Sequence, residues 1–198
     1  MLKRMANLLL FLLIAVGILL FYNFYSTQVE QTNSTTNLFS KKDAPMPVKL
    51  HPLIEDKTNE LVTMMADVGI SIVITEGFRS IEEQDALYEQ GRTAEGDIVT
   101  HAKGGESFHN FGLAVDFALE TPNGGVIWDM EYDGNGNAKA DWMEVVKAAK
   151  KLGFEWGGDW QHFKDYPHLQ MPLGLTINDL QDGMRPDADE QWLEEAEV

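Results

Sequence analysis

Two polar segments far apart in the chain carry most of its candidate chemistry, and bringing them together constrains the fold. One is SFHNFGLAVD, residues 107–116, and the other is DYPH, residues 165–168. His109 and Asp116 are seven residues apart, so on one straight strand they would point to opposite faces. They converge only if the backbone turns between them, which Gly112 permits. We therefore expect His109 on a loop entering a strand, Asp116 within that strand, and His168 on a neighbouring strand.

Two imidazoles and a carboxylate form a common ligand set for a hydrolytic zinc ion that keeps its fourth position open to water. Zinc lowers the pKa of bound water to about 7 and polarises a scissile carbonyl. Pro167 stiffens the second segment, so Asp165 could lie beside that water and act as a general base. Arg79, in the GFRS turn at residues 77–80, is the candidate to stabilise charge on the carbonyl oxygen.

Spacing alone does not select these residues. His51, His101 and His162 are also present, and a single histidine is more often a hydrogen-bonded structural residue than a ligand. Asp165 alone would be an ordinary turn residue, and Arg79 alone a surface charge. A zinc ion held only for structure would need a fourth protein ligand, for which His101 or His162 is a candidate. The residues by themselves leave these alternatives open.

Composition restricts the type of metal site and the class of partner. The chain has no cysteine, which excludes a disulfide framework and a thiolate zinc site, so any metal must use His, Asp and Glu. A net charge of −17 argues against a nucleic-acid partner, because phosphates demand basic patches. The 198 residues suffice for one compact domain with appendages.

The N-terminus, residues 1–25, predicts a membrane anchor. Lys3 and Arg4 precede the apolar run Leu8–Tyr25, which is long enough to cross a hydrocarbon core of roughly 30 Å. The basic pair should stay in the cytoplasm, which places the rest of the chain outside. The alternative is a cleaved signal peptide, which would make the protein secreted, but bulky aromatics stand where a cleavage site needs small residues. Residues 26–47 are polar and predict a flexible linker.

The remaining chain predicts one domain over residues 48–174, followed by a mobile acidic tail, residues 175–198. Apolar spacing predicts helices near residues 54–68, 80–90 and 142–152. Ser80 and Glu83 have the spacing of a capping box. Strands are expected near residues 70–75, 112–119, 125–130, 154–156 and 168–171, and residues 92–106 should form a loop over the site. Irregular alternation of strands and helices predicts an α+β fold, a small antiparallel sheet flanked by helices.

At these residues the chain resembles the bacterial zinc peptidase family of D-Ala-D-Ala carboxypeptidases and L-alanyl-D-glutamate endopeptidases of cell walls and phage endolysins. The family pattern S-x-H-x-x-G-x-A-x-D is matched in full by residues 107–116, and the later acid-x-x-His element by residues 165–168. The similarity runs from about residue 48 to residue 172 and includes GFRS and the WGGDW segment at 156–160. It implies the fold of the zinc D-Ala-D-Ala peptidases, which is also hedgehog-like.

The resemblance implies a role for each residue of the motif. Three side chains become zinc ligands: His109, Asp116 and His168. Asp165 becomes the catalytic base and Arg79 the partner of the carbonyl oxygen. Three more residues are expected to support the ligands or contact substrate: Ser107, Gln84 and Trp160.

The resemblance also implies a peptidoglycan stem peptide as the substrate. An Asp as base and the WGGDW segment are more similar to the endopeptidase branch, since the carboxypeptidase branch typically has Glu-x-x-His. A D-Ala-D-Ala carboxypeptidase and a noncatalytic, zinc-containing wall-binding module are the alternatives.

A second motif suggests calcium. Residues 133–144 carry oxygen-bearing side chains at positions 1, 3, 5, 9 and 12 of an EF-hand loop: Asp133, Asn135, Asn137, Asp141 and Glu144. Ala138 stands where an EF-hand needs glycine. A polar turn without any ion is the alternative. Calcium here would have a structural role, fixing the loop before the helix that starts near residue 142.

Overall fold

The computed structural model describes residues 39–40, 44–186 and 193. The chain divides into two compact units, Met1–Ser40 and Lys41–Val198, and in the first only strand β1 (Phe39–Ser40) is described. The predicted membrane anchor, residues 1–25, and most of the predicted linker therefore lie outside the described residues. Among the residues that are described, no helix has both the length and the apolar character needed to cross a membrane.

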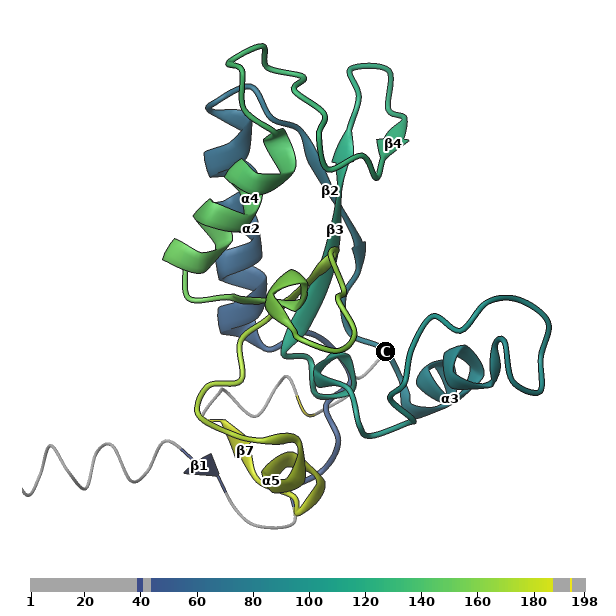
Figure 1. The fold of residues 1–198 in the computed structure, drawn as a ribbon. Coiled ribbons are helices and arrows are strands. Elements are labelled where there is room, and N and C mark those ends of the chain that lie inside the picture. Colours follow the sequence, from purple (N-terminus) through teal and green to yellow (C-terminus); the bar gives the residue numbers. More distant parts are fainter. Residues whose placement is uncertain (1–38, 41–43, 187–192, 194–198) are drawn as a thin grey trace, which may run out of the picture. The chain divides into compact units, whose positions relative to one another are not determined.

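The second unit is built on a small antiparallel sheet, as predicted. In spatial order its strands are β2 (Ile72–Glu76), β3 (Ala114–Glu120), β6 (His168–Gln170) and β5 (Glu155–Trp156), with β4 (Val126–Ile127) also pairing with β3. Strand β3 is thus central (Figure 1). It is also buried along most of its length. The strand predicted at residues 125–130 is reduced to the two residues of β4. Because β3 joins the site segments, its neighbours decide which side chains can meet.

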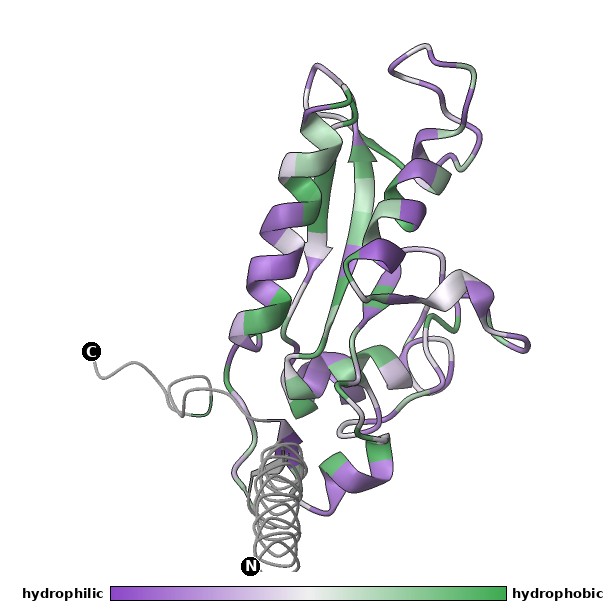
Figure 2. Ribbon diagram, turned by 90° about the vertical axis from the view of Figure 1, so that its left-hand side faces the viewer, coloured by the Kyte–Doolittle hydropathy of each residue, from purple (hydrophilic) through white to green (hydrophobic). Residues whose placement is uncertain are grey.

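Two helices cover one side of this sheet. Helices α2 (Pro52–Ala66) and α4 (Asp141–Lys151) lie side by side there (Figure 1). Their buried apolar residues fall at helical spacing on one face of each helix: Ile54, Leu61 and Met65 in α2, and Trp142, Val145, Val146 and Ala149 in α4. Hydrophobic residues line the strands, whereas both helices alternate between hydrophobic and hydrophilic positions (Figure 2). Burying one such large side chain contributes roughly 1.5–3 kcal/mol, so these stripes hold the layers together.

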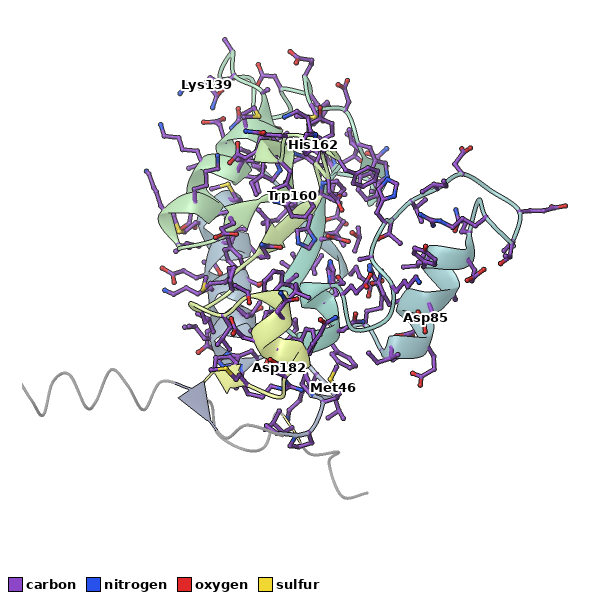
Figure 3. The ribbon with its side chains drawn as sticks, turned by 60° about the horizontal axis from the view of Figure 1, so that its bottom comes forward. Met46, Asp85, Lys139, Trp160, His162 and Asp182 are labelled. Atoms are coloured by element: carbon purple, nitrogen blue, oxygen red, sulfur yellow. The ribbon has the colours of Figure 1, made fainter. Side chains whose placement is uncertain are left out.

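Helix α3 (Ile81–Glu89) lies across the strands from α2 and α4 (Figure 1). Its predicted capping box is confirmed: the Ser80 hydroxyl accepts from the Glu83 amide at 3.1 Å, and the Glu83 carboxylate accepts from the Ser80 amide at 2.8 Å. The loop after α3 is tied back to the helix, because the Gly104 amide donates to the Asp85 carboxylate at 2.7 Å. Asp85 is labelled on this helix in Figure 3.

The fold continues past residue 174, where the mobile tail was predicted to begin. Helix α5 (Ile177–Gln181) and strand β7 (Arg185–Pro186) follow. Leu175 and Leu180 belong to the hydrophobic core. Arg185 is also buried, and its guanidinium donates to the backbone carbonyls of Leu180 at 2.6 Å and Pro45 at 3.0 Å. The prediction is therefore wrong for residues 175–186, because it rested on the acidic composition of the tail as a whole, which does not reveal the two core leucines.

Candidate metal centre

The backbone brings His109, Asp116 and His168 together in the way the sequence predicted. His109 lies in the 3₁₀ turn η1 (Phe108–Phe111), where the Ser107 hydroxyl accepts from the His109 amide at 3.3 Å. Gly112 ends this turn with φ +63°, and a Cβ there would overlap the carbonyl oxygen of Lys49. Asp116 then pairs directly with His168 across β3 and β6. Directly opposite residues share a sheet face, so the bend and the register together form the site.

The three candidate ligand atoms form a nearly equilateral triangle. His109 Nε2 lies 3.2 Å from Asp116 Oδ1 and 3.1 Å from His168 Nδ1, and the third side, His168 Nδ1 to Asp116 Oδ1, is 3.2 Å. Zinc–ligand bonds of about 2.0–2.1 Å in a tetrahedron separate neighbouring ligands by about 3.3 Å. The side chains therefore already have the spacing of three corners of a zinc coordination sphere.

Hydrogen bonds outside the triangle determine which ring nitrogens face its centre. His109 Nδ1 lies 2.6 Å from the Gly77 carbonyl oxygen, which can only accept, so Nδ1 carries the proton and Nε2 offers a lone pair. His168 Nε2 lies 3.0 Å from the Gln170 side-chain oxygen, which leaves a lone pair on Nδ1. Two imidazole lone pairs and a carboxylate oxygen then converge with no proton between them. Such a donor set fits a divalent cation.

Electrostatics within this cluster keep Asp116 ionised. Burial alone would raise the pKa of Asp116. In the metal-free protein, however, a ring that takes up a proton donates it to Asp116, and these hydrogen bonds and the charges of both rings outweigh burial and hold that pKa well below its ordinary value. Burial likewise disfavours the charged form of His168, yet Asp116 raises the pKa of His168 above its usual range. An ionised carboxylate is the form that binds a metal ion.

Arg79 lies beside the triangle and is held in place by a buried amide. Its guanidinium Nη1 donates to the Gln84 side-chain oxygen at 2.9 Å, and Nη2 lies 3.7 Å from Asp116 Oδ2. Gln84 is fully buried, and its amide nitrogen donates to the Ala102 carbonyl at 2.8 Å. Arg79 Nε is buried and has no hydrogen-bond partner among the described residues. The predicted supporting residue Gln84 thus orients Arg79 and ties the 92–106 loop to the site.

Asp165 faces the same cavity as the ligands and Arg79. Burial, and then the negative charge of Asp116, raise the pKa of Asp165, while His168, His109 and Arg79 oppose the shift.

The position of Asp165 depends on Gly157 in the turn η2 (Gly157–Asp159). The Asp165 amide donates to the Gly157 carbonyl at 3.2 Å, and a Cβ on Gly157 would overlap the Asp165 backbone oxygen.

The cavity has a volume of about 520 Å³ and two walls. Residues 99–102 of the loop after α3 form one wall, and Trp160 and Phe163 belong to the other. The Trp160 ring packs against His168 at a centroid distance of 5.1 Å, and Figure 3 labels Trp160 and His162 on the segment between η2 and β6. The His101 and Phe163 rings meet edge to face at 4.8 Å, which joins the two walls.

The alternative histidines do not join the ligands. Among the residues with described positions, the one group with metal-ligand spacing is His109, Asp116 and His168. His51 caps α2, where its Nδ1 accepts from the Leu53 amide at 3.2 Å. His101 contacts Phe163 instead, and His162 is exposed. A structural site closed by His101 or His162 as a fourth ligand is therefore not what the geometry shows.

Sequence reasoning missed Gln170 and two acids. Gln170 contacts His168, and Glu155 contacts Gln170 in turn. Glu76 pairs with Asp116 across β2 and β3, and its carboxylate lies 3.5 Å from Arg79 Nη2. The spacing of His168 and Gln170 was an available signal, because alternate residues of one strand share a face. Glu155 and Glu76 had no signal before the strand register was known.

The predicted calcium loop gains no support. The Asp133 carboxylate accepts from the Asn137 amide at 3.1 Å and the Ala138 amide at 2.9 Å, while the Glu144 carboxylate accepts from the Asn137 side chain at 2.7 Å. The loop oxygens therefore close the turn on itself, and Asp141, Asp133 and Glu144 do not form a group with metal-ligand spacing. Ala138 adopts φ +63°, the conformation for which an EF-hand uses glycine. The polar turn without an ion accounts for these contacts.

Comparison with known proteins places the chain among cell-wall peptidases. The model of a family described as D-alanyl-D-alanine carboxypeptidase matches residues 100–171. The chain is 62% identical over 130 residues to the peptidoglycan L-alanyl-D-glutamate endopeptidase CwlK of Bacillus subtilis (strain 168), which covers 66% of this chain and 78% of that protein. It is 35% identical over 102 residues to the L-alanyl-D-glutamate peptidase of Listeria phage A118, covering 52% of this chain and 31% of the phage protein.

Solved structures are also similar. The crystal structure of the Serratia marcescens L-Ala D-Glu endopeptidase ChiX aligns with 68% of this chain and 94% of its own, at 25% identity and a TM-score of 0.37. The family assignment rests on the sequence identity to CwlK and not on this structural likeness. With that identity and the His-Asp-His group in place, the chain is a metallopeptidase that belongs to the bacterial zinc peptidase family of D-Ala-D-Ala carboxypeptidases and L-alanyl-D-glutamate endopeptidases.

Proposed function

We propose that this chain cuts the bond between L-alanine and D-glutamate in peptidoglycan stem peptides. The observation that carries the proposal is the 62% identity to CwlK, whose name states this activity, over 78% of its length. The cavity beside the metal centre adds support, because it is walled on two sides and contains the acid and the guanidinium that a hydrolase needs. A wall-binding module without catalysis would need neither.

We propose His109, Asp116 and His168 as the zinc ligands. When bound, zinc supplies a water of lowered pKa and a polarised scissile carbonyl. Asp165 accepts a proton from the attacking water and returns it to the leaving amine. Its raised pKa suits the first step, because a carboxylate with a higher pKa is the stronger base.

The remaining residues orient the reaction. Arg79 stabilises the negative charge that develops on the carbonyl oxygen, and Gln84 fixes the plane of its guanidinium. Ser107 holds the backbone of His109 in the η1 turn. Trp160 packs on the His168 ring and contributes to the cavity wall, where it contacts the stem peptide.

A D-Ala-D-Ala carboxypeptidase is the second candidate, because the family model matching residues 100–171 has that description. The two activities give different products. An endopeptidase creates a new D-glutamate amino terminus, whereas a carboxypeptidase releases free D-alanine. Mass spectrometry of a pentapeptide muropeptide digested by the purified protein separates them. Free D-alanine without a new D-glutamate terminus would replace the endopeptidase proposal with the carboxypeptidase one.

Two variants test the assignment of the base. Asp165→Asn should lower turnover roughly 100- to 10,000-fold, the usual contribution of a general base, while the protein still binds zinc. Asp159→Asn is the matched control, because Asp159 is exposed, lies in η2 and pairs with Lys150 at 2.6 Å outside the cavity. It should cleave at the wild-type rate. Equal turnover in both variants would mean that Asp165 is not the base.

We further propose that the N-terminal segment anchors the protein in the cytoplasmic membrane with the peptidase domain outside. The support is the apolar run Leu8–Tyr25 behind Lys3 and Arg4. Membrane fractionation should recover the full chain with the membrane, and a chain that starts at Ser26 should lose this association. A mature amino terminus inside the segment would show instead that it is a cleaved signal.

A further inference from the structure

Gln170 lies between the metal centre and an acid on the neighbouring strand. His168 and Gln170 are alternate residues of β6, so their side chains project from the same sheet face. Gln170 is paired directly with Glu155 across β5 and β6. This register creates a row of three side chains, His168, Gln170 and Glu155, that leads from the centre to the surface.

Hydrogen bonds connect the whole row. His168 Nε2 lies 3.0 Å from the Gln170 side-chain oxygen, and the Gln170 amide nitrogen donates to the Glu155 carboxylate at 2.9 Å. His168 is 5% exposed and Gln170 7% exposed, whereas Glu155 is exposed. The inner contact is therefore sheltered from water and the outer one is not.

The order of donors along this row follows from the chemistry of Glu155. An ionised carboxylate only accepts, so it selects the orientation in which the Gln170 NH₂ group faces it. The Gln170 oxygen must then face His168 and accept a hydrogen bond from Nε2–H. A flipped amide would set its oxygen against the Glu155 carboxylate, which is a repulsive contact, and would leave His168 Nε2 without an acceptor. Glu155 thereby determines the tautomer of His168 through Gln170.

We propose that Gln170 and Glu155 are positioning residues that hold His168 as its Nε2–H tautomer, so that Nδ1 presents its lone pair to the metal. This inference rests on the proposed role of His168 as a zinc ligand. His109 has the same requirement but uses the backbone oxygen of Gly77, which no substitution removes. His168 is the ligand whose orientation depends on side chains.

Replacing Gln170 or Glu155 should lower zinc affinity more than it lowers the free energy of unfolding of the metal-free protein. Without an acceptor at Nε2, the proton of neutral His168 can move to Nδ1, where it competes with the metal. Removing such an outer partner of a zinc-bound histidine typically lowers metal affinity roughly 10- to 100-fold. A residue that merely joined β5 to β6 would change unfolding of the metal-free protein instead.

The experiment measures zinc affinity by chelator competition in the full-length protein. Gln170→Met keeps the shape of the side chain but offers no comparable acceptor, and it should lose roughly 10- to 100-fold in affinity. Glu131→Gln, an exposed acid in a loop outside the cavity, is the matched control and should bind like wild type. Long-range nitrogen-15 NMR of the His168 ring should find the proton on Nε2 in the wild type.

A swapped pair gives the sharpest test. Gln170→Glu combined with Glu155→Gln restores an acceptor toward His168 and a donor behind it. The double variant should bind zinc more tightly than Gln170→Met and keep the Nε2–H signal. A loss of zinc affinity in the double variant as large as in Gln170→Met, or affinity of Gln170→Met within twofold of wild type, would overturn the proposal.

These outcomes are separable from failure of the proposed function. A wild-type protein that binds zinc but does not cut the L-alanyl-D-glutamate bond would refute that function and leave the row testable by affinity and NMR. If the wild-type protein cuts the bond and Gln170→Met binds zinc as tightly as the wild type, only the proposed positioning role of Gln170 and Glu155 is refuted. Comparing the unfolding of metal-free wild type and Gln170→Met shows whether any loss comes from the fold.

Discussion

The substitution Gly112→Ala tests the claim that one backbone bend assembles the metal centre. Gly112 has φ +63° and lies between His109 and Asp116, and its carbonyl accepts from the His51 amide at 2.9 Å. An added Cβ would overlap the Lys49 oxygen and stand 3.1 Å from the His51 nitrogen. The methyl group therefore meets backbone atoms that cannot rotate away.

The magnitude follows from two separate terms. A left-handed conformation costs a residue with a Cβ roughly 1–2 kcal/mol. Forcing an extra carbon into a packed site adds roughly 1–3 kcal/mol. The free energy of unfolding should therefore fall by about 2–5 kcal/mol in total, which corresponds to roughly 4–20 °C in Tm for a domain of this size.

Gly124→Ala is the matched control for this experiment. Gly124 also has a positive φ, +79°, but nothing lies within 4 Å of the Cβ it would gain. The free energy of unfolding of Gly124→Ala should fall only by the roughly 1–2 kcal/mol that a left-handed conformation costs, and its zinc affinity should be unchanged. Urea titration measures both losses, and chelator competition measures zinc. If Gly112→Ala were no less stable than Gly124→Ala and bound zinc equally well, the bend would not be what aligns His109 with Asp116.

Three further predictions concern charge and metal. Arg79→Lys should lower turnover with little change in zinc affinity, because a lysine cannot hold Gln84 and still face the carbonyl oxygen; steady-state kinetics on a muropeptide check this. In the metal-free protein, folding raises the pKa of Asp165. The contribution of Asp165 to the free energy of unfolding is therefore favourable at low pH, where the carboxyl is protonated, and is lost as the pH rises through the raised pKa. Asp165→Asn should therefore stabilise metal-free protein at neutral pH and not at pH 3, by thermal melts. Chelation should abolish cleavage and lower the Tm, and added zinc should restore both, since zinc binds only the folded protein.

The sequence predicted the centre well because its constraints were local. The odd spacing of His109 and Asp116 required a bend, and Gly112 marked it, so η1 and β3 appear where expected. The capping box at Ser80 and the apolar stripe of α4 are likewise properties of neighbouring residues. The sequence also predicted His168 on a strand next to that of Asp116, and the antiparallel register of β3 and β6 confirms it.

What the sequence missed depends on contacts between distant segments. Glu155 gains a role only because β5 pairs with β6 in one particular register. The acidic composition of residues 175–198 as a whole predicts a mobile tail, yet Leu180 and Arg185 are buried, and Arg185 donates to the distant Pro45 carbonyl. No periodic pattern in a segment this short separates a core leucine from an exposed one.

The contacts of the Arg185 guanidinium determine where this protein can be truncated. A fragment that stops at residue 174 would retain every residue proposed for catalysis, and by motif alone it would look complete. It would nevertheless lack Leu180, which packs into the core from α5. It would also lack Arg185, whose guanidinium donates to the backbone oxygens of Pro45 and Leu180. If such a fragment were inactive, the cause would be the loss of this core packing and of these hydrogen bonds. Its inactivity would not count against the proposed catalytic residues.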